Sequence, residues 1–413
     1  MLQKLPTKVF SAHPGPFVGQ PNLVEVQTNS YAKFLKKDIR ELLDEVSPIK
    51  DYSGKDLELH FGEFTFDEPK YDEEYSKFKD LTYEATLRVN AKLINNKTKV
   101  TREQEVYFGD FPVMTPRGTF IINGVERVVV SQLIRSSGVY FTANMWRGRK
   151  LFGAKVIPNR GAWLEFETDP DGFLGVKIDR RRKASVTDVL KIFGNVTDEQ
   201  LLKEFADVDK GAIKFIPPTL KKGSKTLDEA YLEIYKRLRP GDLATAENAK
   251  SLIDAMFNRL DRYDVSTVGR FKINQRLAVY DKDGLSFGAK DSASGKKDKE
   301  SRLLGYDDLV RITKEIIKLN NEQSAEPDDI DHLGNRRVRP VGELLQNKLR
   351  VGLARMKRIV QDRMSTLDID VLSSAQLVNA RPLISVVKEF FSSSQLSQFM
   401  DQVNPLAEIE HKR

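Results

Sequence analysis

The chain of 413 residues contains no cysteine. This absence excludes disulfide bonds, thiol nucleophiles and thiolate zinc sites, and it is typical of proteins in a reducing cytosol. No apolar run is long enough to span a bilayer, and the N-terminal MLQKLPTKVF lacks the pattern of a signal peptide. We therefore expect a cytoplasmic protein.

Recognised catalytic motifs are also missing. The sequence has four histidines and none of the patterns GxxxxGK[ST], GxGxxG, HExxH or GxSxG. The acidic stretch DDIDHLGNRR, from Asp328 to Arg337, could suggest a metal site. A turn with acid–arginine pairing is favoured there, because no supporting ligand pattern exists. We expect no metal and no cofactor, and a chain that binds something while the chemistry lies elsewhere.

The composition is that of a globular chain with two or three domains, since 40% of residues are hydrophobic and 31% are charged. Apolar spacing predicts a helix over 23–46 and half-buried strands over 57–66, 83–94 and 103–114. Asn123-Gly124 and Asp171-Gly172 each predict a hairpin turn. Helices are expected at 201–205, 227–238, 246–260, 307–321, 341–364 and 374–391, with a capping box at Thr197 and a surface loop over 282–300. The fold class is therefore α+β.

Positive charge is concentrated between Arg336 and Arg363, where the sequence has nine basic residues and two acidic residues. That excess of seven equals the net charge of the whole chain, +7. An amphipathic helix with a cationic face could hold phosphates through forked arginine contacts. It could equally be a solvated surface helix, and the sequence leaves both interpretations open.

Long segments of the chain resemble one known family. They are INGVERVVVSQLIRSSGVYF, PNRGAWLEFE, IYKRLRPGD, RYDVSTVGRFK, DDIDHLGNRRVRPVGELLQNKLRVGLARM and FFSSSQLSQFMDQVNPLAEIEHKR. Together they are similar to the β subunit of bacterial DNA-dependent RNA polymerase, in the same order, from about residue 20 to the end. In that family the last segment continues into a long remainder, so we expect Arg413 to mark a truncation.

The resemblance implies a multidomain α+β architecture in which one domain is inserted into another. Residues 1–134 and 331–390 resemble the two parts of the protrusion domain, and residues 135–330 resemble the lobe. Residues 391–413 resemble the start of the fork and rifamycin-pocket region. Many members of the family have proline at Ser137 and glycine at Ser392, and these departures put only local turn geometry in question.

The resemblance also assigns candidate sites. The pocket for rifamycin-class inhibitors, beside the path of the nascent RNA, maps to Arg127, Val130, Gln132, Gln395, Leu396, Gln398, Phe399, Asp401 and His411. The pocket for the non-template DNA strand maps to Arg135, Trp163, Ile330, Asp331 and Arg336. In this pocket Trp163 would stack on an unpaired base, although a tryptophan in a hairpin is usually part of the core. The docking edge for the transcription–repair coupling translocase maps to Thr101, Arg102 and Glu103.

The activity implied is that of a DNA-directed RNA polymerase, a nucleotidyltransferase, with this fragment inactive alone. The family's catalytic Mg²⁺ is held by the β′ subunit, and the implied partners are the β′, α, ω and σ subunits, DNA and nascent RNA. A different class of function stays open, in which the chain is a stand-alone module that binds single-stranded nucleic acid.

Overall fold

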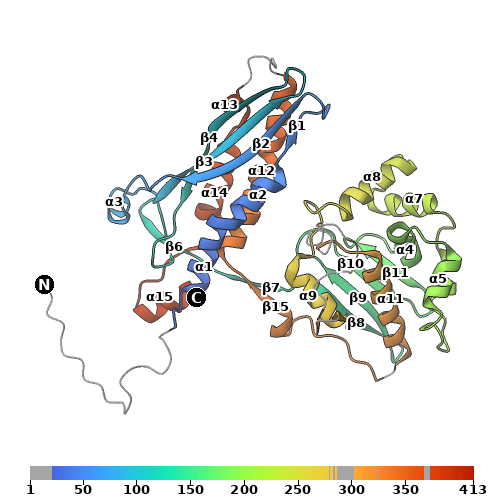
Figure 1. Cartoon of the computed structure of the whole chain (residues 1–413). Coiled ribbons are helices and arrows are strands. Elements are labelled where there is room, and N and C mark those ends of the chain that lie inside the picture. The colour runs from blue at the N-terminus through green and yellow to red at the C-terminus, as the bar shows by residue number, and fades with distance from the viewer. Residues whose placement is uncertain (1–20, 279, 282–283, 286–301, 323, 367–372) are drawn as a thin grey trace, which may run out of the picture. The chain divides into compact units, whose positions relative to one another are not determined.

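The structure is a computed structural model that describes residues 21–278, 280–281, 284–285, 302–322, 324–366 and 373–413. The chain divides into two compact units (Figure 1). Unit 1 comprises Met1–Leu133 and Val338–Arg413, and unit 2 comprises Ile134–Arg337. The unit boundary at 337 lies beyond the position 330 that the resemblance suggests for the end of the inserted domain. Most of the predicted surface loop over 282–300 lies outside the described residues.

Unit 1 begins with one continuous helical rod, as the apolar spacing over 23–46 predicts. It consists of α1 (Glu25–Lys33), a π-helical turn (Phe34–Asp38) and α2 (Ile39–Val46). Apolar side chains such as Tyr31, Phe34 and Leu42 are buried along one side. The rod therefore contributes a full face to the core of unit 1.

The sheet of unit 1 has four antiparallel strands in the order β1 (Ile49–Lys50), β2 (Leu57–Phe66), β3 (Glu84–Asn95) and β4 (Val100–Pro112). The predicted alternation is confirmed in β3, where Leu87, Val89, Ala91 and Leu93 are buried. Short helix α3 (Glu73–Phe78) lies between β2 and β3 in the sequence. Since β4 ends the strand order, its outer backbone groups form a sheet edge.

Long helix α12 (Val341–Thr366) covers this sheet together with α14 (Arg381–Ser393) (Figure 1). The predicted stripe of Leu345, Leu349, Leu353, Met356 and Val360 is buried. The prediction of one helix over 374–391 is wrong, because α13 (Ser374–Leu377) ends before 378–380. The Asn379 carboxamide accepts the Arg381 N–H, and a proline follows at 382, so a new helix begins there.

A second, three-stranded sheet in unit 1 combines distant segments. The Asn123-Gly124 turn joins β5 (Phe120–Ile122) to β6 (Val125–Val129), and both turn residues have positive φ, at 49° and 78°. This confirms the predicted hairpin. Strand β16 (Ser397–Phe399) pairs with the other edge of β6, and α15 (Pro405–Lys412) follows it.

Unit 2 contains a five-stranded antiparallel sheet in the order β12 (Ala184–Ser185), β11 (Leu174–Ile178), β10 (Leu164–Thr168), β9 (Arg149–Ile157) and β8 (Gly138–Trp146). The hairpin turn predicted at Asp171-Gly172 joins β10 to β11. A two-stranded ribbon of β13 (Tyr280–Asp281) and β14 (Gly284–Leu285) follows later in the sequence.

Helices make up most of the rest of unit 2, as predicted. They are α4 (Val186–Gly194), α5 (Asp198–Phe205), α6 (Ile216–Lys222), α7 (Leu227–Leu238), α8 (Ala246–Phe257), α9 (Ser266–Arg276) and α11 (Tyr306–Asn321). The capping box predicted at Thr197 and Gln200 is present at the start of α5. The chain passes between the units through β7 (Gln132–Arg135) and β15 (Arg336–Arg339), and a 3₁₀ turn (Leu333–Asn335) precedes β15.

Candidate nucleic-acid interfaces

The first candidate interface is built on the pairing of β6 with β16 in unit 1. Register places Phe399 opposite Arg127 and Gln398 opposite Val128. The Arg127 guanidinium carbon lies 4.3 Å from the centre of the Phe399 ring, and Nη1 of Arg127 donates to the Ser397 carbonyl at 3.1 Å. Phe399 remains 62% exposed, so this ring presents an apolar and cation-backed surface to solvent.

The ladder continues past Val129. The Val130 N–H donates to the Leu396 carbonyl at 2.8 Å, and Leu396 packs against the core of unit 1. Gln395 is exposed, and its carbonyl accepts a hydrogen bond from the Gln398 carboxamide at 3.1 Å. Gln132 begins β7, and its side chain is exposed.

His411 closes the turn that follows β16. Its Nδ1 accepts the Asp401 N–H at 3.1 Å, and its Nε2 lies 3.0 Å from Oε1 of Gln398. Because Nδ1 is an acceptor, the neutral ring carries its proton on Nε2 and donates it to Gln398. Helix α15 holds His411 in place, since Asn404 caps its first turn by accepting the Ala407 N–H.

These contacts join most of the residues that the resemblance assigns to the rifamycin pocket. We call their shared surface the β6–β16 surface, and define it as Arg127, Val130, Gln395, Leu396, Gln398, Phe399, Asp401 and His411. It offers carboxamide, carboxylate and guanidinium groups beside an exposed aromatic ring and a partly buried leucine. Such a mixture suits a ligand with many hydroxyl groups, or the phosphates and bases of RNA.

A buried carboxylate in β6, that of Glu126, was not predicted. Glu126 accepts hydrogen bonds from Nζ of Lys77 at 2.8 Å and from the Thr119 hydroxyl at 2.6 Å. Burial raises the pKa of the Glu126 carboxyl, but these hydrogen bonds outweigh it, and the net pKa lies below the ordinary glutamate range. The Glu126 carbonyl also accepts the Met400 N–H at 3.1 Å, so this residue supports the end of β16.

The second candidate interface lies in unit 2. The Arg135 guanidinium donates to Oδ1 of Asp331 from Nη2 at 3.2 Å and from Nε at 3.3 Å. Both side chains are exposed, whereas Ile330 and Arg336 are partly buried. Four of the five residues assigned to the non-template-strand pocket therefore lie along two short segments, 330–336 and the end of β7.

Trp163, the fifth residue, immediately precedes β10 and is partly buried. The Arg180 guanidinium lies 5.5 Å from its ring centre, and the Trp163 carbonyl accepts the Asp179 N–H. The loop before Trp163 is tied to β15, because Nη2 of Arg337 donates to Oδ1 of Asn159 at 2.9 Å. Arg180 follows β11 and was not selected from the sequence. The basic cluster DRRRK, residues 179–183, is the signal that could have indicated it.

The acidic stretch DDIDHLGNRR makes the acid–arginine pairs that the sequence favours. Asp328 accepts the Phe141 N–H at 2.8 Å, and Nε of Arg276 donates to it at 3.1 Å. Within the described ranges, no group of three or more His, Asp or Glu side chains could hold a metal ion. Likewise, none of the described helices is long and apolar enough to cross a membrane.

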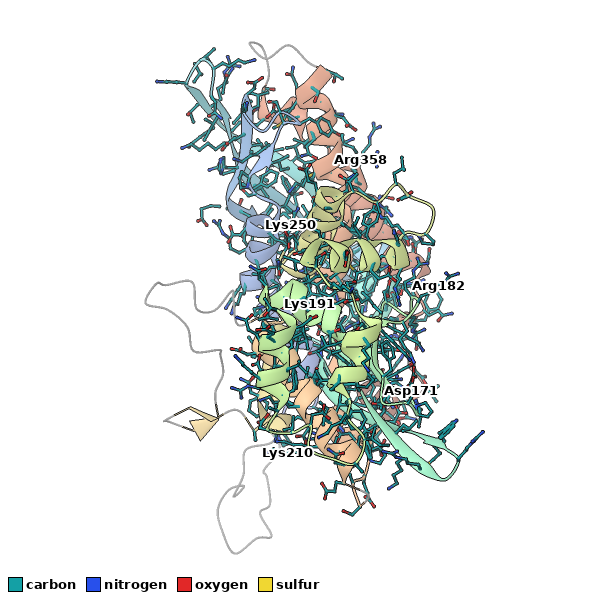
Figure 2. All side chains as sticks on the ribbon, turned by 90° about the vertical axis from the view of Figure 1, so that its right-hand side faces the viewer. Asp171, Arg182, Lys191, Lys210, Lys250 and Arg358 are labelled. Atoms are coloured by element: carbon teal, nitrogen blue, oxygen red, sulfur yellow. The ribbon has the colours of Figure 1, made fainter. Side chains whose placement is uncertain are left out.

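The basic segment makes many contacts inside unit 1. Arg350 pairs with Glu45 at 3.0 Å, Arg339 pairs with Glu343 at 3.4 Å, and Arg363 donates to the Gln376 carbonyl at 2.6 Å. Arg355 and Arg358 on α12 are exposed, and Arg358 is labelled in Figure 2. The geometry therefore favours a structural helix with a few solvated cations over one continuous phosphate-binding face.

The third candidate site is the outer edge of β4. Thr101, Arg102 and Glu103 are exposed, and they pair across the inner edge with Ile94, Leu93 and Lys92 of β3. Lys92 and Glu103 form an ion pair at 3.0 Å. An edge strand of this kind can accept the backbone of a partner strand.

A family model and a curated relative both match this chain, and they point to the same family. A family model described as RNA polymerase beta subunit matches residues 22–385. A DNA-directed RNA polymerase subunit beta from Chloroflexus aggregans (strain MD-66 / DSM 9485) is 48% identical over 417 aligned residues. The alignment covers 95% of this chain and 33% of the relative, so the chain spans about a third of the length of that curated protein.

Proposed function

Because the chain belongs to the RNA polymerase beta subunit family, we propose that it contributes, within a longer subunit, to DNA-templated RNA synthesis. The β6–β16 surface borders the nascent RNA, and the segments around Asp331 and Trp163 hold the non-template strand. The convergence of Arg127, Gln398, Phe399 and His411 on one surface supports this proposal most strongly. Local sequence alone does not bring residues 127 and 399 together.

The chemistry of each site suits its proposed ligand. Aromatic stacking contributes about 1–3 kcal/mol per base, and Trp163, which is partly buried, supplies the aromatic ring. Arg336 and Asp331 supply a donor and an acceptor for a guanine edge, where a bidentate contact contributes about 1–3 kcal/mol of discrimination. The catalytic Mg²⁺ would be held by β′, and the proposed partners are the β′, α, ω and σ subunits in the cytoplasm.

The DNA part of the proposal is tested by promoter-complex lifetimes. Polymerase assembled with a full-length beta subunit that carries Trp163→Ala or Arg336→Ala should form complexes with shorter lifetimes. The effect of Arg336→Ala should depend on a guanine at the contacted position, because guanine is the base whose two acceptors, O6 and N7, take a bidentate contact from arginine. Unchanged lifetimes on templates with and without that guanine would argue against both roles.

The RNA-path part is tested with rifampicin. In the same assembled enzyme, Asp401→Val or His411→Tyr should weaken inhibition sharply while RNA synthesis continues. Asp401→Val removes a carboxylate from the β6–β16 surface, and His411→Tyr replaces the imidazole that contacts the Asp401 N–H and Gln398 with a larger side chain of different geometry. Wild-type sensitivity in both variants would contradict the assignment. A stand-alone single-strand module would instead bind single-stranded DNA tightly as this chain and would not assemble with β′.

A further inference from the structure

Gln27 on α1 is a buried polar residue that sequence reasoning did not single out. Its side chain is almost fully buried, with a relative exposure of 1% for the residue. The amide nitrogen Nε2 donates to the Val129 carbonyl at 2.9 Å and to the Lys412 carbonyl at 2.8 Å. Since both partners are carbonyl oxygens, the nitrogen must face them, and both of its hydrogens are used.

The two acceptors belong to two different elements that carry the β6–β16 surface, β6 and α15. Val129 is the last residue of β6 and pairs with Ser397 of β16. Lys412 is the last residue of α15 and directly follows His411. His411 in turn contacts Gln398 and the Asp401 N–H. Gln27 therefore completes, from the buried side, a ring of contacts that runs through β6, β16 and α15.

The Lys412 carbonyl needs such a partner. A buried carbonyl that stays unpaired is costly. Lys412 is 6% exposed, so water is largely kept from this end of α15. The Gln27 amide supplies the missing hydrogen bond from a helix 385 residues earlier in the sequence.

We propose that Gln27 is a positioning residue that holds α15 against β6. It thereby fixes His411 relative to the Arg127–Phe399 pair. The ligand consequence rests on the proposed function, because it assumes that RNA or a rifamycin binds the β6–β16 surface. The mechanical part does not depend on that assumption. Gln27 itself is buried, so it would act through α15 and β6 and not by touching the ligand.

Hydrogen exchange of backbone amides in this 413-residue chain tests the mechanical part. Gln27→Met keeps the length of the side chain and removes both donors. It should speed exchange at the Asp401 and Val130 amides by roughly tenfold, the range expected for loss of a buried hydrogen bond. Amides of the β3–β4 ladder should keep their rates, because that sheet lies outside the ring of contacts.

Gln361→Met is the matched control, since Gln361 also donates to a carbonyl of unit 1, that of Lys50, at 3.0 Å. It should leave the Asp401 and Val130 rates unchanged. The proposal is overturned if Gln27→Met leaves these two rates at their wild-type values. It is also overturned if Gln27→Met accelerates all amides of unit 1 equally, because that pattern is a general loss of stability.

Rifampicin inhibition of polymerase assembled with the full-length beta subunit tests the ligand part. Gln27→Met should raise the concentration needed for half inhibition by about tenfold. Local acceleration of exchange together with unchanged inhibition would contradict the proposed function of the β6–β16 surface, while the positioning role of Gln27 would stand. The two failures are therefore distinguishable.

Discussion

The Arg127 guanidinium lies over the Phe399 ring, 4.3 Å from its centre, at the point where these two residues are paired in adjacent strands. The same guanidinium donates to the Ser397 carbonyl. One side chain thus binds both the backbone and the exposed ring of β16. This relationship fixes the apolar part of the β6–β16 surface.

A double-mutant cycle measures this pairing. We expect a coupling free energy of about 0.5–1 kcal/mol between Arg127→Ala and Phe399→Ala, the usual strength of an exposed cation–π contact. Exchange of the Val130 amide, which donates to Leu396, reports the opening of β16. Arg88→Ala with Phe399→Ala should be additive, since Arg88 contacts Asp67 and Glu105 instead. Equal coupling in both cycles would contradict the contact.

Acidification should destabilise unit 1 through Glu126. The pKa of this carboxyl is lowered in the folded chain, so its contribution to stability is fully present above the ordinary glutamate pKa of about 4.3. The contribution is lost as the pH falls from there through the lowered folded pKa. Glu126→Gln should flatten this dependence, which the Ile122 methyl NMR signals can follow during urea unfolding. An unchanged pH dependence in the variant would contradict the role of Glu126.

The loop that carries Asp331 should loosen when Asp328 is removed. Asp328→Ala leaves the Phe141 N–H and the Arg276 guanidinium without their shared acceptor, and should cost about 1–3 kcal/mol of unfolding free energy. Both tryptophans of the chain, Trp146 and Trp163, belong to unit 2. Tryptophan fluorescence during urea unfolding therefore reports this unit.

Asp329→Ala is the control for this experiment. The Asp329 carboxylate is exposed and accepts the Asp331 N–H at 3.0 Å. Its loss should change the unfolding free energy by less than about 0.5 kcal/mol. An equal loss in the two variants would show that Asp328 does not anchor the loop.

Local patterns predicted the long helices and several strands of both units, but they did not single out β8, β9, α4, α6 or α9. Alternation gave β2 and β3, an Asn-Gly pair gave the β5–β6 hairpin, and a capping box gave the start of α5. These signals act over a few residues, so they are legible in a single sequence. The break at 378–380 was missed because the apolar spacing continues across it.

Long-range polar contacts could not be predicted in this way. The net charge of residues 336–363 does not show that Arg350 forms an ion pair with Glu45, or that Arg363 donates to carbonyls of another helix. Gln27 is one glutamine in a helical stretch, and its two acceptors lie 102 and 385 residues away. Only the family resemblance placed residues 127 and 399 in one site before their contact was seen.

The edge of β4 should dock the transcription–repair coupling translocase. The Glu103 carboxylate pairs with Lys92, and Glu103→Arg puts a second positive charge beside that lysine. This variant should abolish capture of the translocase by immobilised polymerase. Glu74→Arg makes the same change of charge at an exposed position on α3 and should leave capture intact. Normal capture by the Glu103 variant would remove this edge from consideration.

The most direct test is a photo-crosslink from the β6–β16 surface. Benzoylphenylalanine would replace Phe399 in a full-length beta subunit assembled into an elongating polymerase, with a matched replacement of the exposed Tyr75 on α3 as the control. If this surface borders the RNA path, irradiation should label the nascent RNA from position 399 and leave it unlabelled from position 75. Actively elongating complexes that give no RNA adduct at position 399, or equal yields at both positions, would contradict the proposed function.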